Sequence, residues 1–231
     1  MAKREDTGMD DQGTMMNRYY PLFLDLKGKT VVVVGGGAVA LRKVEALRRT
    51  GAKVKVIAPE VAPGIREDRE IEVVLRDYAP GDLFAASLVI AATDDQATNL
   101  AVSRDAHLSN IFCNVVDQPE LCSFIVPSVV EKGPIKIAIS TGGISPTLSK
   151  KLRRDISRFL GDEYATLALV MGRIRPLVIA GEGGFESHKR IFEILINSEL
   201  IDAIRDHDRA LAEKILYEAL GEHIDLTEIM P

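Results

Sequence analysis

The hydrophobic positions in the first half of the chain alternate between the periods of strands and helices. Thr30–Val34 is a continuous β-branched run, and three glycines follow it directly. Such a run, bounded by turn residues, is typical of a strand that is buried on both faces of a parallel sheet. Val39–Thr50 then has apolar residues at helical spacing, and Gly51 is expected to cap this helix at its C-terminus. The pattern therefore predicts a strand, a glycine turn and a helix in succession.

The same alternation continues as far as residue 116. A helix is expected at Asp95–Ser109, between the last two of four further strands. These strands are expected at Val54–Ile57, Ile71–Leu75, Leu88–Ala92 and Ile111–Val116. Strands that alternate with helices in this order predict an α/β fold with a Rossmann-like, doubly wound parallel sheet.

The pattern changes after residue 122. Two more strands are expected over Ser123–Val130 and Ile135–Ser140. The rest is helical, with helices expected over Thr147–Leu160, Glu163–Ile179, Phe185–Asn197 and Asp208–Leu220. The predicted organisation is a disordered leader at 1–17, a sheet domain at 18–127, a strand–helix segment at 128–160 and a small C-terminal helical domain at 161–231.

Composition and charge narrow the classes of function. The chain has 231 residues, of which 46% are hydrophobic and 27% charged, and its formal net charge of -5 argues against a nucleic-acid binder. Two cysteines and four scattered histidines suit neither a disulfide framework nor a histidine metal site, and they favour the cytoplasm. No apolar run reaches the roughly 20 residues that span a bilayer. We therefore expect a cytoplasmic protein without a metal centre, a nucleic-acid partner or a membrane partner.

The glycine turn predicts a dinucleotide-binding site. Gly35-x-Gly37-x-x-Ala40 matches the pattern GxGxxA. In this motif Gly35 allows the tight turn, Gly37 lets the backbone approach a pyrophosphate, and Ala40 lets the helix pack close to the sheet. Free N–H groups at the start of the helix then face the phosphates. The alternative is a glycine turn that only packs, but its place between a buried strand and a helix favours binding.

The residues after the second strand bear on the choice of cofactor. An acidic residue at the end of this strand usually binds the ribose hydroxyls. This chain has Ala58-Pro59-Glu60 there, so ribose recognition is expected to use Glu60 or the backbone. No arginine follows immediately to bind a 2′-phosphate, which favours NAD over NADP.

Polar side chains also follow the fourth and fifth strands, at the edge where ligands bind in this architecture. Thr93 and Asp94 end the fourth strand, and either Asp94 or Asp95 could cap the next helix rather than act in catalysis. Asp117 ends the fifth strand in Cys113-Asn114-Val115-Val116-Asp117. A carboxylate in the cleft suits proton transfer. The alternative is a turn aspartate before Gln118-Pro119.

Five segments occur together in the order and spacing of one known family. They are Val-Gly-Gly-Gly-x-Val-Ala-x-Arg-Lys (34–43), Ala-Ala-Thr-Asp-Asp (91–95), Cys-Asn-Val-Val-Asp (113–117), Ser-Phe-Ile-Val-Pro-Ser (123–128) and Ser-Thr-Gly-Gly-Ile-Ser-Pro (140–146). Together they resemble the siroheme synthase amino-terminal domain family, which contains precorrin-2 dehydrogenases and bifunctional dehydrogenase–ferrochelatases. The resemblance covers residues 18 to about 160, and the later helices match more loosely.

The resemblance implies an activity and a set of site residues. In this family NAD+ takes a hydride from precorrin-2 to give sirohydrochlorin in siroheme (porphyrin-type tetrapyrrole) biosynthesis, and some members then insert Fe2+. Whether this chain is also a ferrochelatase stays open. The family's principal catalytic group corresponds to Asp117. The contacts expected with NAD are Gly35, Gly37, Ala38, Val39, Pro59, Glu60 and Thr93.

The segment after residue 140 is the expected substrate site. Its glycine turn could bind substrate carboxylates on N–H groups, or serve only as a helix start with Ser145 as N-cap and Pro146 next, and both can hold at once. Lys150 begins a basic run that is either a solvated face or a means of steering the substrate. The candidates are Thr141, Gly142, Gly143, Ser145 and Lys150.

The resemblance also implies a homodimer. Residues 18–127 would then be the NAD-binding domain, and residues 128–160 the dimerisation and substrate segment. The alternative function is a regulatory NAD-binding sensor module, similar to the gating domains of potassium transport systems. Those domains share the glycine turn and an Ala-Thr-Asp-Asp-like strand end, but they lack the three later segments.

Overall fold

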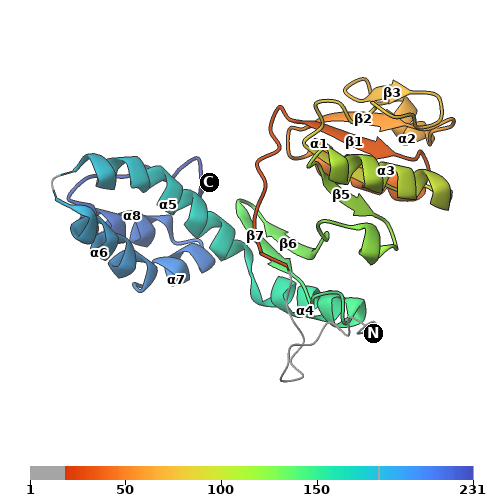
Figure 1. Cartoon of the computed structure of the whole chain (residues 1–231). Coiled ribbons are helices and arrows are strands. Elements are labelled where there is room, and N and C mark those ends of the chain that lie inside the picture. The colour runs from red at the N-terminus through yellow and green to blue at the C-terminus, as the bar shows by residue number, and fades with distance from the viewer. Residues whose placement is uncertain (1–18, 182, 231) are drawn as a thin grey trace. The chain divides into compact units, whose positions relative to one another are not determined.

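The chain forms two compact units, Met1–Val126 and Pro127–Pro231. The computed structural model describes residues 19–181 and 183–230 (Figure 1). The leader expected at 1–17 lies outside the described residues. The further division expected at residue 160 stays a prediction.

The first unit is built on a parallel sheet of five strands in the order β3-β2-β1-β4-β5. The strands are β1 (Thr30–Val34), β2 (Lys53–Ile57), β3 (Glu72–Val74), β4 (Leu88–Ala91) and β5 (Phe112–Val115). The chain leaves β1 toward one edge and returns to its other side at β4, so the strand order reverses beside β1. This confirms the predicted doubly wound sheet, and it places a ligand crevice at the carboxyl end of β1.

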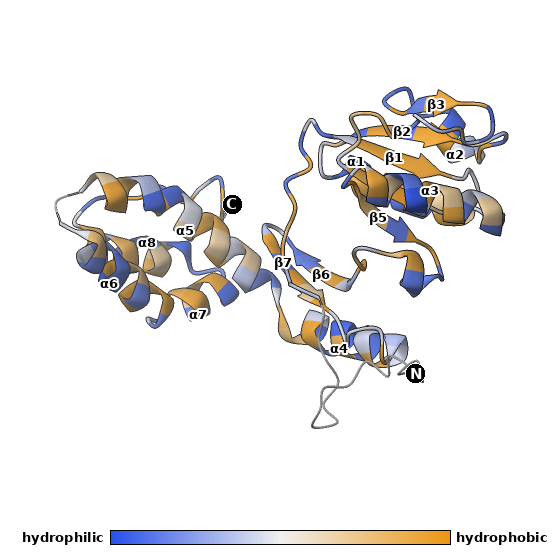
Figure 2. Cartoon of the chain, viewed as in Figure 1, coloured by the Kyte–Doolittle hydropathy of each residue, from blue (hydrophilic) through white to orange (hydrophobic). Residues whose placement is uncertain are grey.

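Helices cover both faces of this sheet. The helices are α1 (Ala38–Arg48), α2 (Pro63–Arg66) and α3 (Gln96–Leu108), and a 3-10 turn follows at Pro119–Leu121. Val31 and Val33 of β1 pack in one core cluster with Val44 of α1. Val32 and Val34 pack in another cluster with the apolar side of α3. Both faces of β1 are buried, and its four valines form a continuous hydrophobic run after Thr30, as Figure 2 shows.

The second unit joins a hairpin to helices. Strands β6 (Ser128–Lys132) and β7 (Ile135–Ile139) pair antiparallel and lead to α4 (Pro146–Phe159). The later helices are α5 (Asp162–Ala180), α6 (Phe185–Ile196), α7 (Leu200–Arg205) and α8 (Arg209–Leu220). Their shared core includes Ile174, Leu195 and Leu216. None of the helices in the described part of the chain is long and apolar enough to cross a bilayer.

Two predicted boundaries were wrong. The strand expected over Ser123–Val130 begins only at Ser128 and continues to Lys132. The preceding segment instead binds beside β5, because Ser123 N–H donates to Cys113 O at 2.8 Å and Asn114 Nδ2 donates to Phe124 O at 3.0 Å.

Helix α1 also ends earlier than expected. Arg49 is its C-cap, and Gly51 lies two residues later with φ +75°. Gly51 therefore turns the chain after the helix has ended. The short helices α2 and α7 were not predicted, because one turn or two of helix leaves too few positions to show a period.

Candidate functional site

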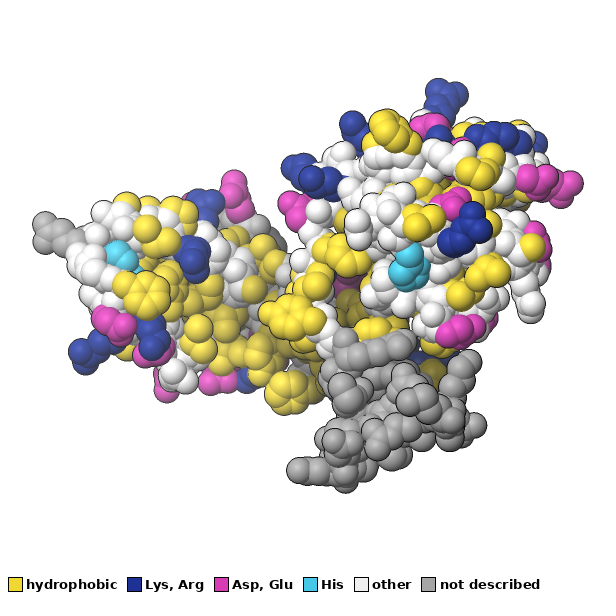
Figure 3. All heavy atoms as spheres, viewed as in Figure 1, with side chains coloured by type: hydrophobic (Ala, Val, Ile, Leu, Met, Phe, Trp, Pro, Cys, Tyr) yellow, Lys and Arg dark blue, Asp and Glu magenta, His cyan; other side chains and the backbone are white. Residues whose placement is uncertain are grey.

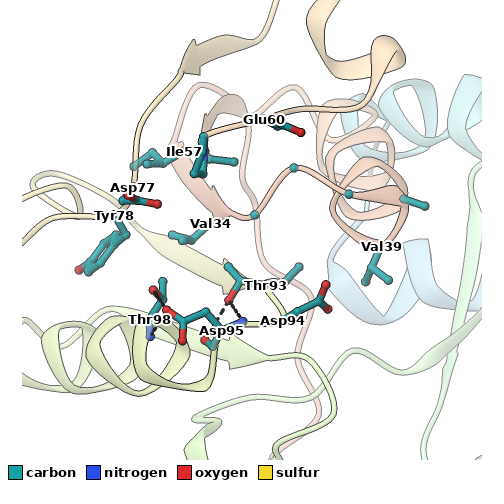
Figure 4. A pocket seen from close by; sticks show the side chains of 17 residues that line it. Val34, Val39, Ile57, Glu60, Asp77, Tyr78, Thr93, Asp94, Asp95 and Thr98 are labelled. Atoms are coloured by element: carbon teal, nitrogen blue, oxygen red, sulfur yellow. Dashed lines mark hydrogen bonds between the residues drawn. The ribbon is translucent and has the colours of Figure 1, made fainter.

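A cavity of about 550 Å³ opens at the carboxyl ends of β1, β2 and β4 (Figure 4). Four short segments of the first unit supply its lining. They are Val34–Val39, Ile57–Glu60, Asp77–Tyr78 and Ala92–Asp95, together with Thr98 of α3. The structure therefore brings together seven of the candidates that sequence analysis selected for the cofactor: Gly35, Gly37, Ala38, Val39, Pro59, Glu60 and Thr93.

The glycine turn forms the wall next to β1. Gly35 has φ +120°, and a Cβ there would lie 2.2 Å from the carbonyl oxygen of Ala92. At Gly36 a Cβ would lie 1.9 Å from the carbonyl oxygen of Glu60. A Cβ on Gly37 would meet nothing within 4 Å in the described structure, so the protein itself leaves that space open. Sequence analysis missed Gly36, because the motif specifies only the first and third glycines.

The start of α1 presents backbone donors to the cavity. Gly37 is the N-cap and supplies no side-chain hydrogen bond, and the first turn of the helix has no acidic residue. The first hydrogen bond of the helix is donated by Leu41 N–H to the carbonyl oxygen of Gly37, at 3.0 Å. The N–H groups of the first turn therefore lack intrahelical acceptors, and the helix dipole makes this end attractive to an anion. Ala40 is fully buried and permits the close packing expected of it.

The side chains around the cavity are acidic. Its lining includes four carboxylates, on Glu60, Asp77, Asp94 and Asp95. Among the described residues that line it, none is Lys, Arg or His. Anion binding by this cavity would therefore depend on backbone N–H groups at the glycine turn rather than on cationic side chains.

The structure decides the role of Asp95. Its carboxylate accepts hydrogen bonds from Ala97 N–H at 3.0 Å and Thr98 N–H at 3.2 Å, so it is the N-cap of α3. The hydrogen bond from the Thr98 hydroxyl, followed by those from the two backbone N–H groups, lowers the pKa of Asp95. Asp94 lines the cavity without a cap role and is exposed.

Thr93 is fixed by its neighbours. Its hydroxyl lies 2.9 Å from Asn99 Oδ1, and its carbonyl accepts from Asn99 Nδ2 at 3.0 Å. Asn99 itself is buried. Thr93 is therefore held rigidly at the cavity wall, with its hydroxyl already engaged by Asn99 and by the backbone of Asp95.

Asp117 does not line this cavity. It lies exposed in the turn after β5 with φ +60°, a conformation that aspartate tolerates better than most residues. The register pairs Ala91 with Val115, so Thr93 and Asp117 each lie two residues beyond a paired position on adjacent strands. Asp117 is therefore one strand away from Thr93, at the same edge of the sheet.

A half-buried lysine on α1 is electrostatically coupled to Asp117. Burial lowers the pKa of Lys43, Arg42 lowers it further, and the negative charge of Asp117 acts in the opposite direction. Val116, next to Asp117, packs in the same core cluster as Val44 of α1. The turn that carries Asp117 thus lies on the α1 side of the sheet.

The five candidates for substrate binding all lie in the second unit, between β7 and the first turns of α4. Thr141 Oγ1 donates to Ser145 O and accepts from Ser145 N–H, both at 3.1 Å, which closes the turn. Gly142 and Gly143 have φ values of +64° and +89°. Ser145 caps α4 by accepting from Leu148 N–H at 3.2 Å, so the predicted helix start is confirmed.

Lys150 is exposed on α4. No carboxylate in the described residues pairs with it. Its ammonium group is therefore available to an acidic ligand, as is typical of a solvated lysine.

Comparisons with known proteins agree with this architecture. Residues 22–128 match the family described as "Putative NAD(P)-binding", and residues 132–158 match "Sirohaem biosynthesis protein central". Siroheme synthase from Pseudomonas fluorescens is 39% identical over 202 residues, which is 86% of this chain and 44% of that protein. Siroheme synthase from Thioalkalivibrio sulfidiphilus is 39% identical over 210 residues, or 90% of this chain and 43% of that protein. Over residues 22–158 the chain is similar to the siroheme synthase amino-terminal domain family.

The chain spans less than half the length of these siroheme synthases. One solved structure, named "SirC, precorrin-2 dehydrogenase", matches with a TM-score of 0.73 and 24% identity, covering 88% of this chain and 100% of that chain. At this identity the match shows a common fold. The match over residues 22–128 identifies the sheet-bearing first unit as a domain for a nicotinamide cofactor.

Proposed function

We propose that this chain is an NAD-dependent precorrin-2 dehydrogenase that forms sirohydrochlorin in siroheme biosynthesis. The main observation is the cavity that gathers the seven cofactor candidates one strand away from Asp117. The names of the relatives support the pathway, and the name of the solved structure with the same fold supports the reaction.

The residues at the glycine turn fit a dinucleotide. A Cβ at Gly35 or Gly36 would collide with backbone atoms, whereas a Cβ at Gly37 would occupy only the open space beside the first turn of α1. This leaves room for a pyrophosphate next to free N–H groups. When bound, the nicotinamide ring would supply the acceptor for a hydride.

The acidic lining favours NAD over NADP. A 2′-phosphate would add negative charge near Glu60, and no lining cation compensates it. We expect NADP to bind at least about tenfold more weakly than NAD, because close like charges are costly. Titration of both cofactors would check this. Glu60→Gln should narrow the preference, whereas Glu67→Gln, an exposed glutamate outside the cavity lining, should leave it unchanged.

Asp117 is the proposed base. Oxidation of the macrocycle removes a proton as well as a hydride, and a carboxylate at the sheet edge can accept that proton. Iron insertion would expel pyrrole protons, which the same carboxylate could receive, and Fe2+ would then be a second substrate. In the second unit, the N–H groups of the Thr141–Ser145 turn and the ammonium of Lys150 are the proposed ligands for substrate carboxylates.

The decisive experiment supplies NAD+ and enzymatically generated precorrin-2 under anaerobic conditions and follows the absorbance of sirohydrochlorin. Asp117→Ala should lower the rate by about 10²-fold or more, since general-base catalysis contributes at least that much. Glu120→Gln, an exposed carboxylate three residues away, is the control and should keep the wild-type rate.

One further measurement and one contrary outcome complete this assay. Ferrous iron added after dehydrogenation tests for siroheme formation. If the wild-type chain binds NAD but forms no sirohydrochlorin, the dehydrogenase proposal fails and the NAD-binding sensor module takes its place.

A further inference from the structure

Two cavity residues with polar side chains, Asp77 and Tyr78, were not selected by the sequence analysis. Asp77 and Tyr78 follow β3, beyond the end of β2, and both line the cavity. Figure 4 shows them beside Ile57, with Thr93 and Asp94 across the cavity. They therefore form the wall on the β2–β3 side of the glycine turn.

Tyr78 is held in place from two directions. Its hydroxyl donates to Asp105 Oδ2 of α3 at 2.9 Å, and its ring packs against the core cluster on that face of the sheet. Burial, followed by the hydrogen bond to Asp105, raises the pKa of Tyr78, so the hydroxyl remains a donor. Because the hydroxyl is engaged, only the ring is free to contact a ligand.

Asp77 presents a free carboxylate. The neighbouring Arg76 donates to both carboxylate oxygens of Asp82, at 2.7 and 2.6 Å, and to the backbone carbonyl of Asp77 at 2.9 Å. Arg76 is thus engaged elsewhere. Within residues 19–181 and 183–230, no donor bonds to the carboxylate of Asp77, which is exposed on the cavity wall.

The position of this wall indicates which half of the dinucleotide it faces. In a doubly wound sheet the first βαβ unit holds the adenosine half, because the acidic residue at the end of the second strand binds its ribose. An adenine base beyond that ribose would offer an exocyclic amino donor and a flat aromatic face. Asp77 supplies an acceptor for the former, and Tyr78 supplies a ring for the latter.

We propose that Asp77 accepts a hydrogen bond from the 6-amino group of the adenine ring, and that Tyr78 packs on the base. This inference rests on the proposed binding of a dinucleotide to the cavity. It makes Asp77 a specificity residue for the base, separate from Glu60 at the ribose. A purine with an oxygen at position 6 would present an acceptor to the carboxylate and bind less well.

The test compares NAD with nicotinamide hypoxanthine dinucleotide, which differs at position 6 of the purine. Dissociation constants are measured calorimetrically with the full chain. The wild type should prefer NAD by about tenfold, because a hydrogen bond to a charged group is lost with the other dinucleotide. Asp77→Ala should bind NAD about tenfold more weakly while its affinity for the hypoxanthine compound stays nearly unchanged.

Two other variants separate recognition from structure. Asp77→Asn should bind both dinucleotides about equally, since an amide can donate or accept. Tyr78→Leu should lower the affinity for both dinucleotides by a similar factor, because an aromatic ring can stack on any base. Glu45→Gln, an exposed carboxylate on α1 outside the cavity lining, is the control and should keep the wild-type preference.

The outcomes are distinguishable. If Asp77→Ala lost affinity for both dinucleotides equally, or if the wild type bound both equally well, the role of Asp77 would be overturned while dinucleotide binding stands. A wild type that binds neither dinucleotide would overturn this inference together with the proposed function.

Discussion

The three consecutive glycines after β1 are needed for different reasons. Gly35 and Gly36 lie against carbonyl oxygens of neighbouring segments, at Ala92 and Glu60, so any side chain would collide with backbone. Gly37 faces open space. Its lack of a side chain matters only to a ligand that approaches the turn. Folding thus constrains Gly35 and Gly36, and under the proposed function binding of the dinucleotide constrains Gly37.

This contrast predicts different effects of the same substitution. Gly36→Ala should destabilise the protein by about 1–3 kcal/mol, as overpacking does, and should weaken NAD binding because the turn must shift. Gly37→Ala meets no such crowding, so it should lower the melting temperature less than Gly36→Ala does, through the poorer N-cap alone, yet it should also weaken NAD binding. Thermal unfolding and NAD titration of both variants check this. A Gly36→Ala protein that melts with the wild type would contradict the crowding at Glu60.

Asp95 should give the first unit a stability that depends on pH. Its hydrogen bonds lower its pKa in the folded state, so its contribution is fully present above the unfolded pKa of about 3.9. That contribution is lost as the pH falls through the lower, folded-state pKa. Asp95→Ala should therefore lower the melting temperature at pH 7, and the difference should shrink below pH 4.

The neighbouring carboxylate provides the control for this experiment. Asp94→Ala removes an exposed side chain that caps nothing, so its melting temperature should follow the wild type across the pH range. Equal shifts for both variants would show that net charge, and not the cap of α3, is responsible.

Helix α4 shows how local signals define one end of an element. Ser145 and Pro146 begin it where helix-start rules place them. Thr141 supports this start from the preceding turn through its bonds to Ser145. The same few residues are the proposed ligands for substrate carboxylates. Variants are therefore needed that change substrate binding without changing the helix cap, or the reverse.

Two substitutions at Ser145 make that separation. Ser145→Ala should cost about 1 kcal/mol of stability, because the N-cap acceptor is lost. Ser145→Asp should keep the cap and the stability, since aspartate is an equally good N-cap. Its negative charge should, however, raise the KM for precorrin-2 by repelling substrate carboxylates. An unchanged KM in Ser145→Asp would place the substrate elsewhere.

The first strand of the second unit shows where local signals fail. The apolar residues of Ser123–Pro127 satisfy a strand pattern, yet this segment bonds irregularly beside β5. Which partner a segment pairs with depends on the sheet already formed, and the sequence pattern does not carry that information.

At the scale of the whole molecule, each unit exposes apolar side chains beyond its core. Figure 3 shows hydrophobic side chains gathered on the helical part of the second unit, where Phe185 is 79% and Ile194 is 53% exposed.

On α4, Leu148 is 46% exposed and Leu152 is 37% exposed, one turn apart on the same side of the helix. An apolar stripe on a helix usually packs against another element. We propose that this stripe packs in a homodimer.

Charge on the α4 stripe should therefore break the dimer. Leu148→Glu combined with Leu152→Lys should convert a dimer into a monomer in light scattering at micromolar concentration, because buried charges disfavour an apolar interface. NAD affinity should stay at the wild-type value, since the cofactor cavity lies entirely in the first unit. Arg153→Gln, an exposed polar position on α4, is the control. A monomeric wild type would end the proposal.

The sequence by itself determined the parallel sheet, the glycine turn and the start of α4. Each of these depends on residues that are close along the chain: a β-branched run, glycines spaced directly after that run, or an N-cap before a proline. Local structure restricts which residue types can occupy neighbouring positions, so it can be predicted from such patterns. For this reason the fold class and the position of Gly35 and Gly37 at a ligand crevice could be predicted from the sequence pattern, whereas the cofactor roles of Ala38, Val39, Pro59 and Glu60 were expected from the family resemblance.

Only the tertiary structure decided which side chains line the same wall of the cavity. Parallel strands bring their carboxyl ends together across long crossovers, so Asp77 and Tyr78 meet the glycine turn although some 40 residues separate them in the chain. The structure also assigned Asp95 to a helix cap, showed that Gly36 lies against Glu60, and placed Asp117 outside the cavity lining. These facts depend on distances between segments that are remote in sequence, and the pattern of any one segment does not record them.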